Sequence, residues 1–362
     1  MEKLRIGIIG AGSLSDVHIQ AYRRNPGVDV VAICDKNIAY SRAKAEKFNI
    51  PRQYENTTDL ISQNDIDAVS IITWNNTHMP LAVAALNAGK HVLCEKPTAL
   101  NAAEALLMQK AAKDNNKLLM IGFVRRFAER VALAKQMIVS GDIGDIYYIK
   151  TEYLRRAGNP GGWFTDKKLS GGGPLLDLGV HMIDQGLWFM GDAKPVSVFG
   201  QVGNKVGPRK NVKGLCGGFL TGYTAVDNGI KSNQEGVEDF ATALIRFDNG
   251  AIMQVCTSWT MHIKADRVNT EVHGSRGGLL VDPGLELYTE SHNYIKEASL
   301  TTNIDPDFEA AFNAEISHFV DCIRNKTACI SHSDDGVKVM AVIDAIYESA
   351  EVGESVKLDV TS

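Results

Sequence analysis

No apolar run in this 362-residue sequence approaches the roughly 20 residues that a membrane-spanning helix needs. No stripe of lysine and arginine is visible, and the formal net charge of −5 argues against a nucleic-acid partner. The six cysteines form no Cys-x-x-Cys pair, which favours reduced thiols in a cytoplasmic setting. We expect no signal peptide, because a strand pattern begins at Leu4.

The residues that are present suit a globular enzyme. Hydrophobic residues make up 44% of the chain and charged residues 22%, which are ordinary shares for a soluble protein. A chain of this length buries a sizeable core and predicts two domains.

The start of the chain carries the most informative pattern. An apolar run, Leu4–Ile9, leads into two glycines, and a helix-like segment follows from about Leu14. A strand, a glycine turn and a helix in this order predict a dinucleotide site: the first glycine permits the turn, and the second lets the backbone approach a pyrophosphate. The pyrophosphate is then expected to lie over Gly10, Gly12, Ser13 and Leu14.

Asp35 ends a second apolar run, Val28–Cys34, about 20 residues beyond the glycine turn. A carboxylate at this place accepts hydrogen bonds from the adenosine ribose hydroxyls and repels a 2′-phosphate, so NAD is the expected cofactor. Lys36 follows Asp35 directly and can attract a 2′-phosphate, so NADP remains an alternative cofactor. The usual third glycine is replaced, with Ser15 near its position, so a plain β–α turn without a ligand is the alternative.

The order of strand-like and helix-like runs in the sequence changes after Gly122. Up to that point strand-like and helix-like runs alternate, which predicts a parallel sheet covered on both faces. From Val196 to Tyr288 several β-prone runs with turn residues predict a mixed or antiparallel sheet in an α+β domain. The stretch Gly203–Glu235 is glycine-rich and polar and carries no assignment. The domains are therefore expected at 1–123 and 124–362.

Two further helices are predicted near the C-terminus, at Phe308–Arg324 and Gly336–Ala350. A large sheet in the second domain needs something to cover one face, so we expect a homodimer or homotetramer. The alternative is that these two helices cover the sheet.

Lys96 follows the predicted strand His91–Cys94, within the tetrapeptide Cys94–Pro97. Ligands of parallel sheets bind beyond the carboxyl ends of the strands, which places Lys96 at the cofactor crevice. An ammonium there lowers the pKa of a substrate hydroxyl and favours the developing alkoxide. A surface lysine in a turn is the alternative.

A glycine-rich approach precedes Asp177 and His181, with Pro174 at the expected first helical position. A spacing of four residues puts both side chains on one face of a helix, where the carboxylate orients the imidazole and raises its basicity. A hydrogen-bonded core histidine is the alternative for His181. No second histidine lies at ligand spacing, so no metal is expected.

The segment Thr73–His78 follows another predicted strand and opens a helix. Thr73, Asn75 and His78 are candidates to line the nicotinamide half of a dinucleotide. A helix cap accounts equally well for Thr77.

Four segments together resemble the Gfo/Idh/MocA oxidoreductases, the family of glucose–fructose oxidoreductase and inositol dehydrogenase. The resemblance covers nearly the whole chain and is carried by Gly10–Gly12, Ala88–Pro97, Gly122–Phe127 and Gly172–His181. The chain departs from the family at Trp74, where proline is frequent, and in the long Gly203–Glu235 stretch.

The resemblance implies an N-terminal Rossmann dinucleotide-binding domain and a C-terminal domain built on a large mixed, mostly antiparallel sheet. It implies an NAD(P)-dependent dehydrogenase that oxidises a secondary hydroxyl of a sugar or cyclic polyol, with His181 as the general base. The implied catalytic set is Lys96, Asp177 and His181. Glu95 joins the cofactor residues, Arg126 is a substrate or cofactor contact, and Trp163 is part of the substrate rim.

Three other functions stay open. Some family members sense a dinucleotide and regulate transcription without catalysis, although retention of Lys96, Asp177 and His181 argues for an enzyme. An NAD-using glycosidase on the same fold shows no net oxidation. A different substrate class, such as a dihydrodiol or a bile pigment, also fits the cofactor site.

Overall fold

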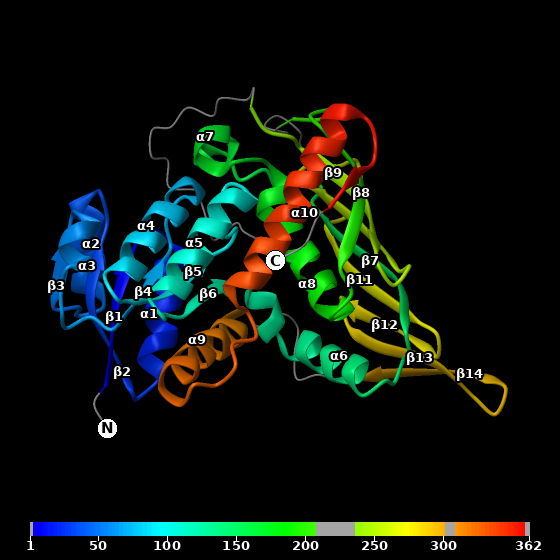
Figure 1. Cartoon of the computed structure of the whole chain (residues 1–362), viewed down its shortest axis with the longest axis horizontal. Coiled ribbons are helices and arrows are strands. Elements are labelled where there is room, and N and C mark those ends of the chain that lie inside the picture. Colours follow the sequence, from blue (N-terminus) through cyan, green and yellow to red (C-terminus); the bar gives the residue numbers. More distant parts are fainter. Residues whose placement is uncertain (1–2, 208–235, 301–307, 359–362) are drawn as a thin grey trace. The chain divides into compact units, whose positions relative to one another are not determined.

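The computed structural model describes residues 3–207, 236–300 and 308–358, and the chain divides into two compact units (Figure 1). Unit 1 comprises Met1–Phe127 and Asp307–Val337, and unit 2 comprises Ala128–Pro306 and Lys338–Ser362. The segment beginning at Asp307 thus groups with the N-terminal part, although the domain limits at 123 and 124 remain a prediction. Among the described residues, no helix is both long and apolar enough to cross a bilayer.

Unit 1 is built on a six-stranded parallel sheet in the order β3-β2-β1-β4-β5-β6. Most positions of β1, β4, β5 and β6 are buried, as expected for strands covered on both faces. The strands are β1 (Leu4–Ile9), β2 (Val28–Cys34), β3 (Arg52–Tyr54), β4 (Ala68–Ile71), β5 (His91–Glu95) and β6 (Leu119–Gly122).

The strands predicted at Leu4–Ile9, Val28–Cys34 and His91–Cys94 are confirmed to within one residue at each end. The sequence missed β3, because its three residues are polar and partly exposed at the sheet edge. The helical segments of unit 1 are α1 (Leu14–Arg24), α2 (Ile38–Lys47), α3 (Thr57–Ile61), α4 (Asn75–Asn87), α5 (Ala102–Asp114), η1 (Val124–Phe127) and α9 (Phe308–Asn325), with the start of α10 (Ser333–Val352).

Helix α9 packs against α1, and both contribute to one hydrophobic cluster with β1. Ile316 and Phe319 of α9 join Ile19 of α1 and Ile8 of β1 in this cluster. The alternative that helix Phe308–Arg324 covers the second sheet is therefore wrong for α9, whose apolar face serves unit 1.

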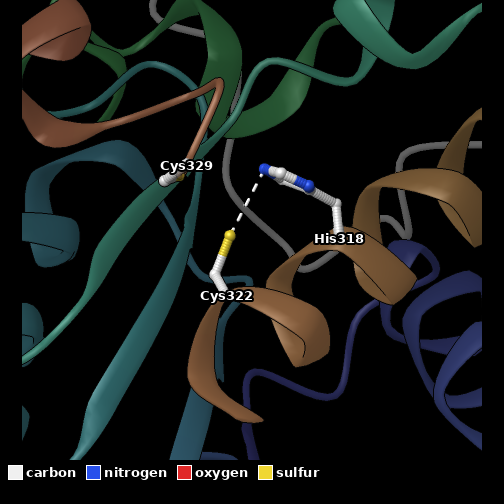
Figure 2. Close-up of side chains that lie close together, drawn as sticks. All are labelled: His318, Cys322 and Cys329. Atoms are coloured by element: carbon white, nitrogen blue, oxygen red, sulfur yellow. Dashed lines mark hydrogen bonds between the residues drawn. The ribbon is translucent and has the colours of Figure 1, made fainter. Parts of the chain in front are cut away.

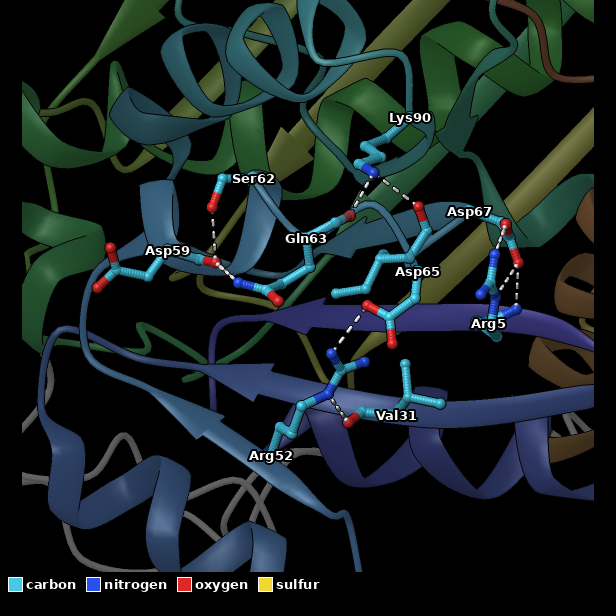
Figure 3. A network of polar contacts seen from close by, with 10 residues as sticks. Arg5, Val31, Arg52, Asp59, Ser62, Gln63, Asp65, Asp67 and Lys90 are labelled. Atoms are coloured by element: carbon cyan, nitrogen blue, oxygen red, sulfur yellow. Dashed lines mark hydrogen bonds and ion pairs between the residues drawn. The ribbon is translucent and has the colours of Figure 1, made fainter.

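A polar network fixes the amino ends of the strands in unit 1 (Figure 3). Arg5 of β1 makes a bidentate ion pair with Asp67, at 2.8 and 3.1 Å, just before β4. The buried Lys90 donates to the carbonyls of Gln63 and Ile66 at 2.6 and 2.8 Å, and burial lowers its pKa. These contacts lie opposite the carboxyl ends of the strands, which stay available for a ligand.

Unit 2 is built on a nine-stranded sheet in the order β14-β13-β12-β11-β7-β10-β9-β8-β15. Only the β7–β10 pairing is parallel among the described pairings, so the expected mixed, mostly antiparallel sheet is confirmed. The strands are β7 (Ile146–Leu154), β8 (Pro195–Gly203), β9 (Phe240–Phe247), β10 (Ile252–Ser258), β11 (Arg267–Gly274), β12 (Gly277–Asp282), β13 (Leu285–Ser291), β14 (Tyr294–Leu300) and β15 (Val356–Lys357).

Helices cover one face of this sheet at short range. A side chain at Gly186 would meet Met253 of β10 at 2.0 Å, and one at Gly200 of β8 would meet the Ile346 carbonyl of α10 at 2.8 Å. The remaining helical segments of unit 2 are α6 (Glu129–Val139), η2 (Gly162–Thr165), α7 (Lys167–Ser170), η3 (Leu175–Gly179) and α8 (Val180–Met190).

The α-helix expected from Pro174 begins differently in the structure. Leu175–Gly179 form a π-helical turn, and the α-helix starts at Val180. Gly179 has poor helix propensity and lies against Thr257 of β10, so tertiary packing overrides the simple α-helical spacing. The stretch Gly203–Glu235 lies mostly outside the described residues.

Candidate active site

The two glycines of the turn in unit 1, Gly10 and Gly12, differ in their backbone conformation and in the space around them. Gly10 has φ of +104°, and a Cβ there would lie 2.2 Å from the Ile72 carbonyl oxygen. A Cβ on Gly12 would meet nothing within 4 Å. The fold therefore requires Gly10, whereas the open space at Gly12, at the N-terminus of α1, fits the close approach of a phosphate.

Asp35 supports this turn from the end of β2. Its carboxylate accepts hydrogen bonds from the backbone N–H groups of Ala11 and Asn37, both at 2.8 Å. A carboxylate has about four acceptor sites, so these bonds orient it and leave capacity for ribose hydroxyls.

Lys36 and Trp74 meet although they are 38 residues apart. The Lys36 ammonium lies 3.5 Å from the centroid of a Trp74 ring, a cation–π contact. Because β2 and β4 flank β1 in the sheet, this contact joins the two loops on either side of the glycine turn. The indole thus holds the Lys36 charge beside the expected path of the cofactor.

Glu95 pairs with a histidine that sequence reasoning missed. His18 of α1 lies 2.8 Å from Glu95 Oε1, and both side chains are buried. The other Glu95 oxygen accepts the backbone N–H of Lys96 at 3.2 Å. No motif in the sequence marks His18, which lies one turn into α1. Only the packing of α1 shows that His18 contacts Glu95, which in turn accepts the Lys96 N–H. The Lys96–Pro97 peptide is cis.

His78 links two loops of unit 1. Its Nδ1 lies 2.8 Å from the Pro97 carbonyl oxygen, and its Nε2 lies 3.2 Å from that of Thr73. Burial lowers the pKa of His78, and a neutral ring donates to only one carbonyl, which we assign to Pro97 from the shorter distance. Asn75 is also buried. Thr77 lies inside α4 and donates to the Trp74 carbonyl at 2.7 Å, but α4 has no side-chain cap, so the helix cap considered for Thr77 is not found.

Arg126 makes buried contacts within unit 1. Its guanidinium pairs with Asp335 at 2.9 Å and donates to the Ile330 carbonyl, and the side chain is 2% exposed. The structure therefore assigns Arg126 an anchoring role between η1 and the start of α10. Its predicted contact with substrate or cofactor stays a prediction.

In unit 2, Asp177 is held by residues that the sequence analysis did not name. The indole N–H of the fully buried Trp259 donates to Asp177 Oδ2 at 2.9 Å. Burial alone would lower the pKa of Arg155, but the nearby Asp177 charge, with Tyr153 and Asp266, raises it overall. His181 follows at the start of α8 and is partly exposed. An oriented carboxylate one turn before a partly exposed imidazole is an arrangement that suits proton transfer.

Glu238 shapes the glycine-rich approach to Asp177. Its carboxylate accepts the N–H groups of Gly173 and Leu175 at 2.9 and 3.1 Å and the Tyr347 hydroxyl at 2.9 Å. Burial raises the pKa of Glu238. A side chain at Gly173 would meet the Glu238 backbone at 2.1 Å, so this glycine allows the close approach.

The other expected substrate-side positions differ in exposure. Trp163 is partly buried and stacks on Phe164, with ring centroids 4.0 Å apart. Asp184 and Gln185, further along α8, are buried. The structure thus gathers Glu95, Lys96 and His78 in unit 1, and Asp177, Trp259 and Arg155 in unit 2.

Comparison with known proteins identifies the family to which the sequence belongs. A model described as "Oxidoreductase family, NAD-binding Rossmann fold" matches residues 4–123, and a GFO/IDH/MocA C-terminal domain matches residues 131–280. The chain is 31% identical to D-glucoside 3-dehydrogenase of Escherichia coli K12 over 98% of this chain and 97% of that protein. It is 27% identical to the NAD(+)-dependent scyllo-inositol 2-dehydrogenase of Bacillus subtilis, over 99% and 97%.

A solved structure of levoglucosan dehydrogenase with NADH and L-sorbose aligns with a TM-score of 0.85 and 26% identity, over 99% of both chains. These findings confirm the predicted fold class, the NAD cofactor and the dehydrogenase class. From the glycine turn to the large mixed sheet, the chain belongs to the GFO/IDH/MocA family of NAD-binding oxidoreductases.

Proposed function

We propose that this dehydrogenase oxidises one secondary hydroxyl of a sugar, glycoside or cyclic polyol. The observation that carries the proposal is the Asp177 carboxylate, oriented by Trp259 and placed one turn before His181. The relatives support the substrate class, since their names specify a D-glucoside, inositols and levoglucosan.

Bound NAD would supply the hydride acceptor for this oxidation. His181 takes the hydroxyl proton, because imidazole is the side chain best suited to accept a proton in general base catalysis. Asp177 orients a neighbouring hydroxyl and favours the imidazolium that forms. The role that we propose for Lys96 of unit 1 is to stabilise a developing alkoxide through its positive charge. Bound NAD would supply the redox chemistry, and the protein would supply orientation and charge.

The cofactor contacts that we propose all come from unit 1. The glycine turn receives the pyrophosphate and Asp35 the ribose hydroxyls. The nicotinamide half contacts a set of polar side chains at the strand ends: Thr73, Asn75, His78, Glu95, Lys96 and Arg126. For Trp163 of unit 2 and for Arg126 of unit 1, a contact with the substrate is part of the proposal.

A panel of inositols, aldoses and alkyl glucosides with NAD and NADP tests the proposal. We expect NADH formation with at least one member, and loss of turnover by several orders of magnitude in His181→Ala with unchanged NADH binding. Full turnover in that variant would remove His181 from its role as base. Release of an aglycone without net NADH would favour the glycosidase, and NADH binding without turnover on any member would favour the regulator.

We also propose a homodimer or homotetramer. On the sheet of unit 2, Phe199 and Leu244 are paired across β8 and β9 and are each 49% exposed, and Ile252 of β10 is 41% exposed. A second copy of the chain would cover this apolar face.

We further propose a reducing, cytoplasmic setting, which the five free cysteines among the described residues support.

A further inference from the structure

We propose that His318, Cys322 and Cys329 form a binding site for one thiophilic d¹⁰ metal ion, represented here by Zn²⁺. The three residues lie in unit 1, at the end of α9 and in the segment before α10 (Figure 2). Neither the proposed reaction nor the cofactor contacts use them.

The ligand atoms already lie at near-coordinating separations. The three atoms are all within 4.8 Å of one another, and Cys322 Sγ lies 3.3 Å from His318 Nε2. A tetrahedral Zn²⁺ with Zn–S of about 2.3 Å and Zn–N of about 2.0 Å separates its sulfur and nitrogen ligands by roughly 3.5 Å. Small side-chain movements therefore suffice to bring all three atoms onto one ion.

Two ligands come from a single helix face. His318 and Cys322 are four residues apart on α9 and therefore lie one above the other. Cys329 is brought to them because the backbone N–H of Ile330 donates to His318 Nε2 at 3.1 Å. The lone pair of Nε2 thus points at the loop that carries Cys329, and a bound ion would take the place of this N–H group on the nitrogen.

Burial affects the imidazole and the two thiols in opposite ways. It lowers the pKa of His318, which favours the neutral ring that coordinates metals. It raises the pKa of Cys322 and of Cys329, so a metal ion has to displace a proton from each thiol when it binds.

Two carboxylates act electrostatically on the cluster. Asp321 on α9 acts on His318 and Cys322, and Asp335 on α10, which pairs with Arg126, acts on Cys329. Binding of Zn²⁺ forms two Zn–S bonds and one Zn–N bond, and releases two protons to solvent without any change of oxidation state. Three protein ligands leave the fourth tetrahedral position for water.

A bound ion would brace a segment that supports β6. Directly after Cys329, the Ile330 carbonyl accepts from Arg126, and the Ser331 carbonyl accepts the N–H of Ile121 at 3.0 Å. From the sequence we expected no metal, because no second histidine lies at ligand spacing from His181. The set His318, Cys322 and Cys329 comes together only when the loop after α9 folds back onto this helix.

The test is titration of the reduced full chain with Co²⁺, followed by Zn²⁺ displacement. We expect one Co²⁺ per chain, with a sulfur-to-cobalt charge-transfer band that Zn²⁺ abolishes. Cys322→Ser and Cys329→Ser should each lose the band, and His318→Gln should bind at least about tenfold more weakly. Because two protons leave, the apparent Zn²⁺ affinity should rise about 100-fold per pH unit between pH 6 and 7.

The matched control is Cys256→Ser, which removes another free cysteine, from β10 in unit 2, and should bind Co²⁺ as the wild type does. Circular dichroism and NADH binding verify that each variant folds. The proposal is overturned if no stoichiometric band forms, if the band survives in Cys322→Ser or Cys329→Ser, or if oxidation joins Cys322 to Cys329 at a rate that Zn²⁺ does not slow. None of these results bears on the dehydrogenase activity.

Discussion

Replacing Trp259 with phenylalanine tests whether the orientation of Asp177 matters for catalysis. Phenylalanine keeps an aromatic ring in this fully buried position but removes the N–H that donates to Asp177 at 2.9 Å. A hydrogen bond to a charged group contributes about 1.5–3 kcal/mol. If that energy holds Asp177 in its productive geometry, kcat/KM should fall about 10- to 100-fold, since about 1.4 kcal/mol corresponds to a tenfold change.

The same substitution also removes part of a buried ring, so the free energy of unfolding should fall by about 1 kcal/mol from the cavity in addition to the lost hydrogen bond. Urea unfolding measures that loss, and steady-state kinetics measures kcat/KM on the best polyol substrate. NADH affinity should stay unchanged, because the cofactor contacts belong to unit 1. The matched control is Trp188→Phe, whose ring stacks on Phe189 at 5.9 Å. If Trp259→Phe loses stability but keeps kcat/KM within twofold, Asp177 needs no orientation by Trp259.

Three more results follow from the structure. Asp35→Ser should raise the NADP-to-NAD preference at least about tenfold, with Lys36 supplying the phosphate charge, and unchanged Kd values for both cofactors would contradict this role. Gly10→Ala should destabilise the fold because its Cβ meets a carbonyl at 2.2 Å, whereas Gly12→Ala should weaken NADH binding with little change in Tm; the reverse pattern would refute the two assignments. Burial lowers the pKa of His91 to about 4, so the unfolded chain binds more protons below pH 6.5. Stability should therefore drop between about pH 6.5 and 4, by about 1–2 kcal/mol after allowance for solvent screening, and His91→Gln should flatten this slope in chemical unfolding curves; an unaltered slope would exclude His91 as its source.

Local patterns predicted much of the fold and part of the site. The strands around Gly10 and Asp35 were found because apolar runs, glycine turns and strand-terminal acids depend on residues close together in the sequence. The spacing of Asp177 and His181 identified two candidate catalytic residues, yet the expected α-helical turn is a π-helical one. Gly179 of that turn lies against Thr257 of β10, and a tertiary contact of this kind leaves no periodic trace in a sequence.

By itself, the sequence determined the parallel sheet of unit 1, the glycine turn and the residue types available for catalysis, because hydrophobic periodicity and backbone freedom are local properties. Only the tertiary structure decided which partners hold the buried polar side chains in place. These hydrogen-bonded pairs are His18 with Glu95, Trp259 with Asp177, and Arg126 with Asp335. Each pair joins positions at least 77 residues apart. A buried charged group requires a hydrogen-bonding partner, which can come from any part of the chain that the fold brings close. The sequence alone does not specify which residue that partner is.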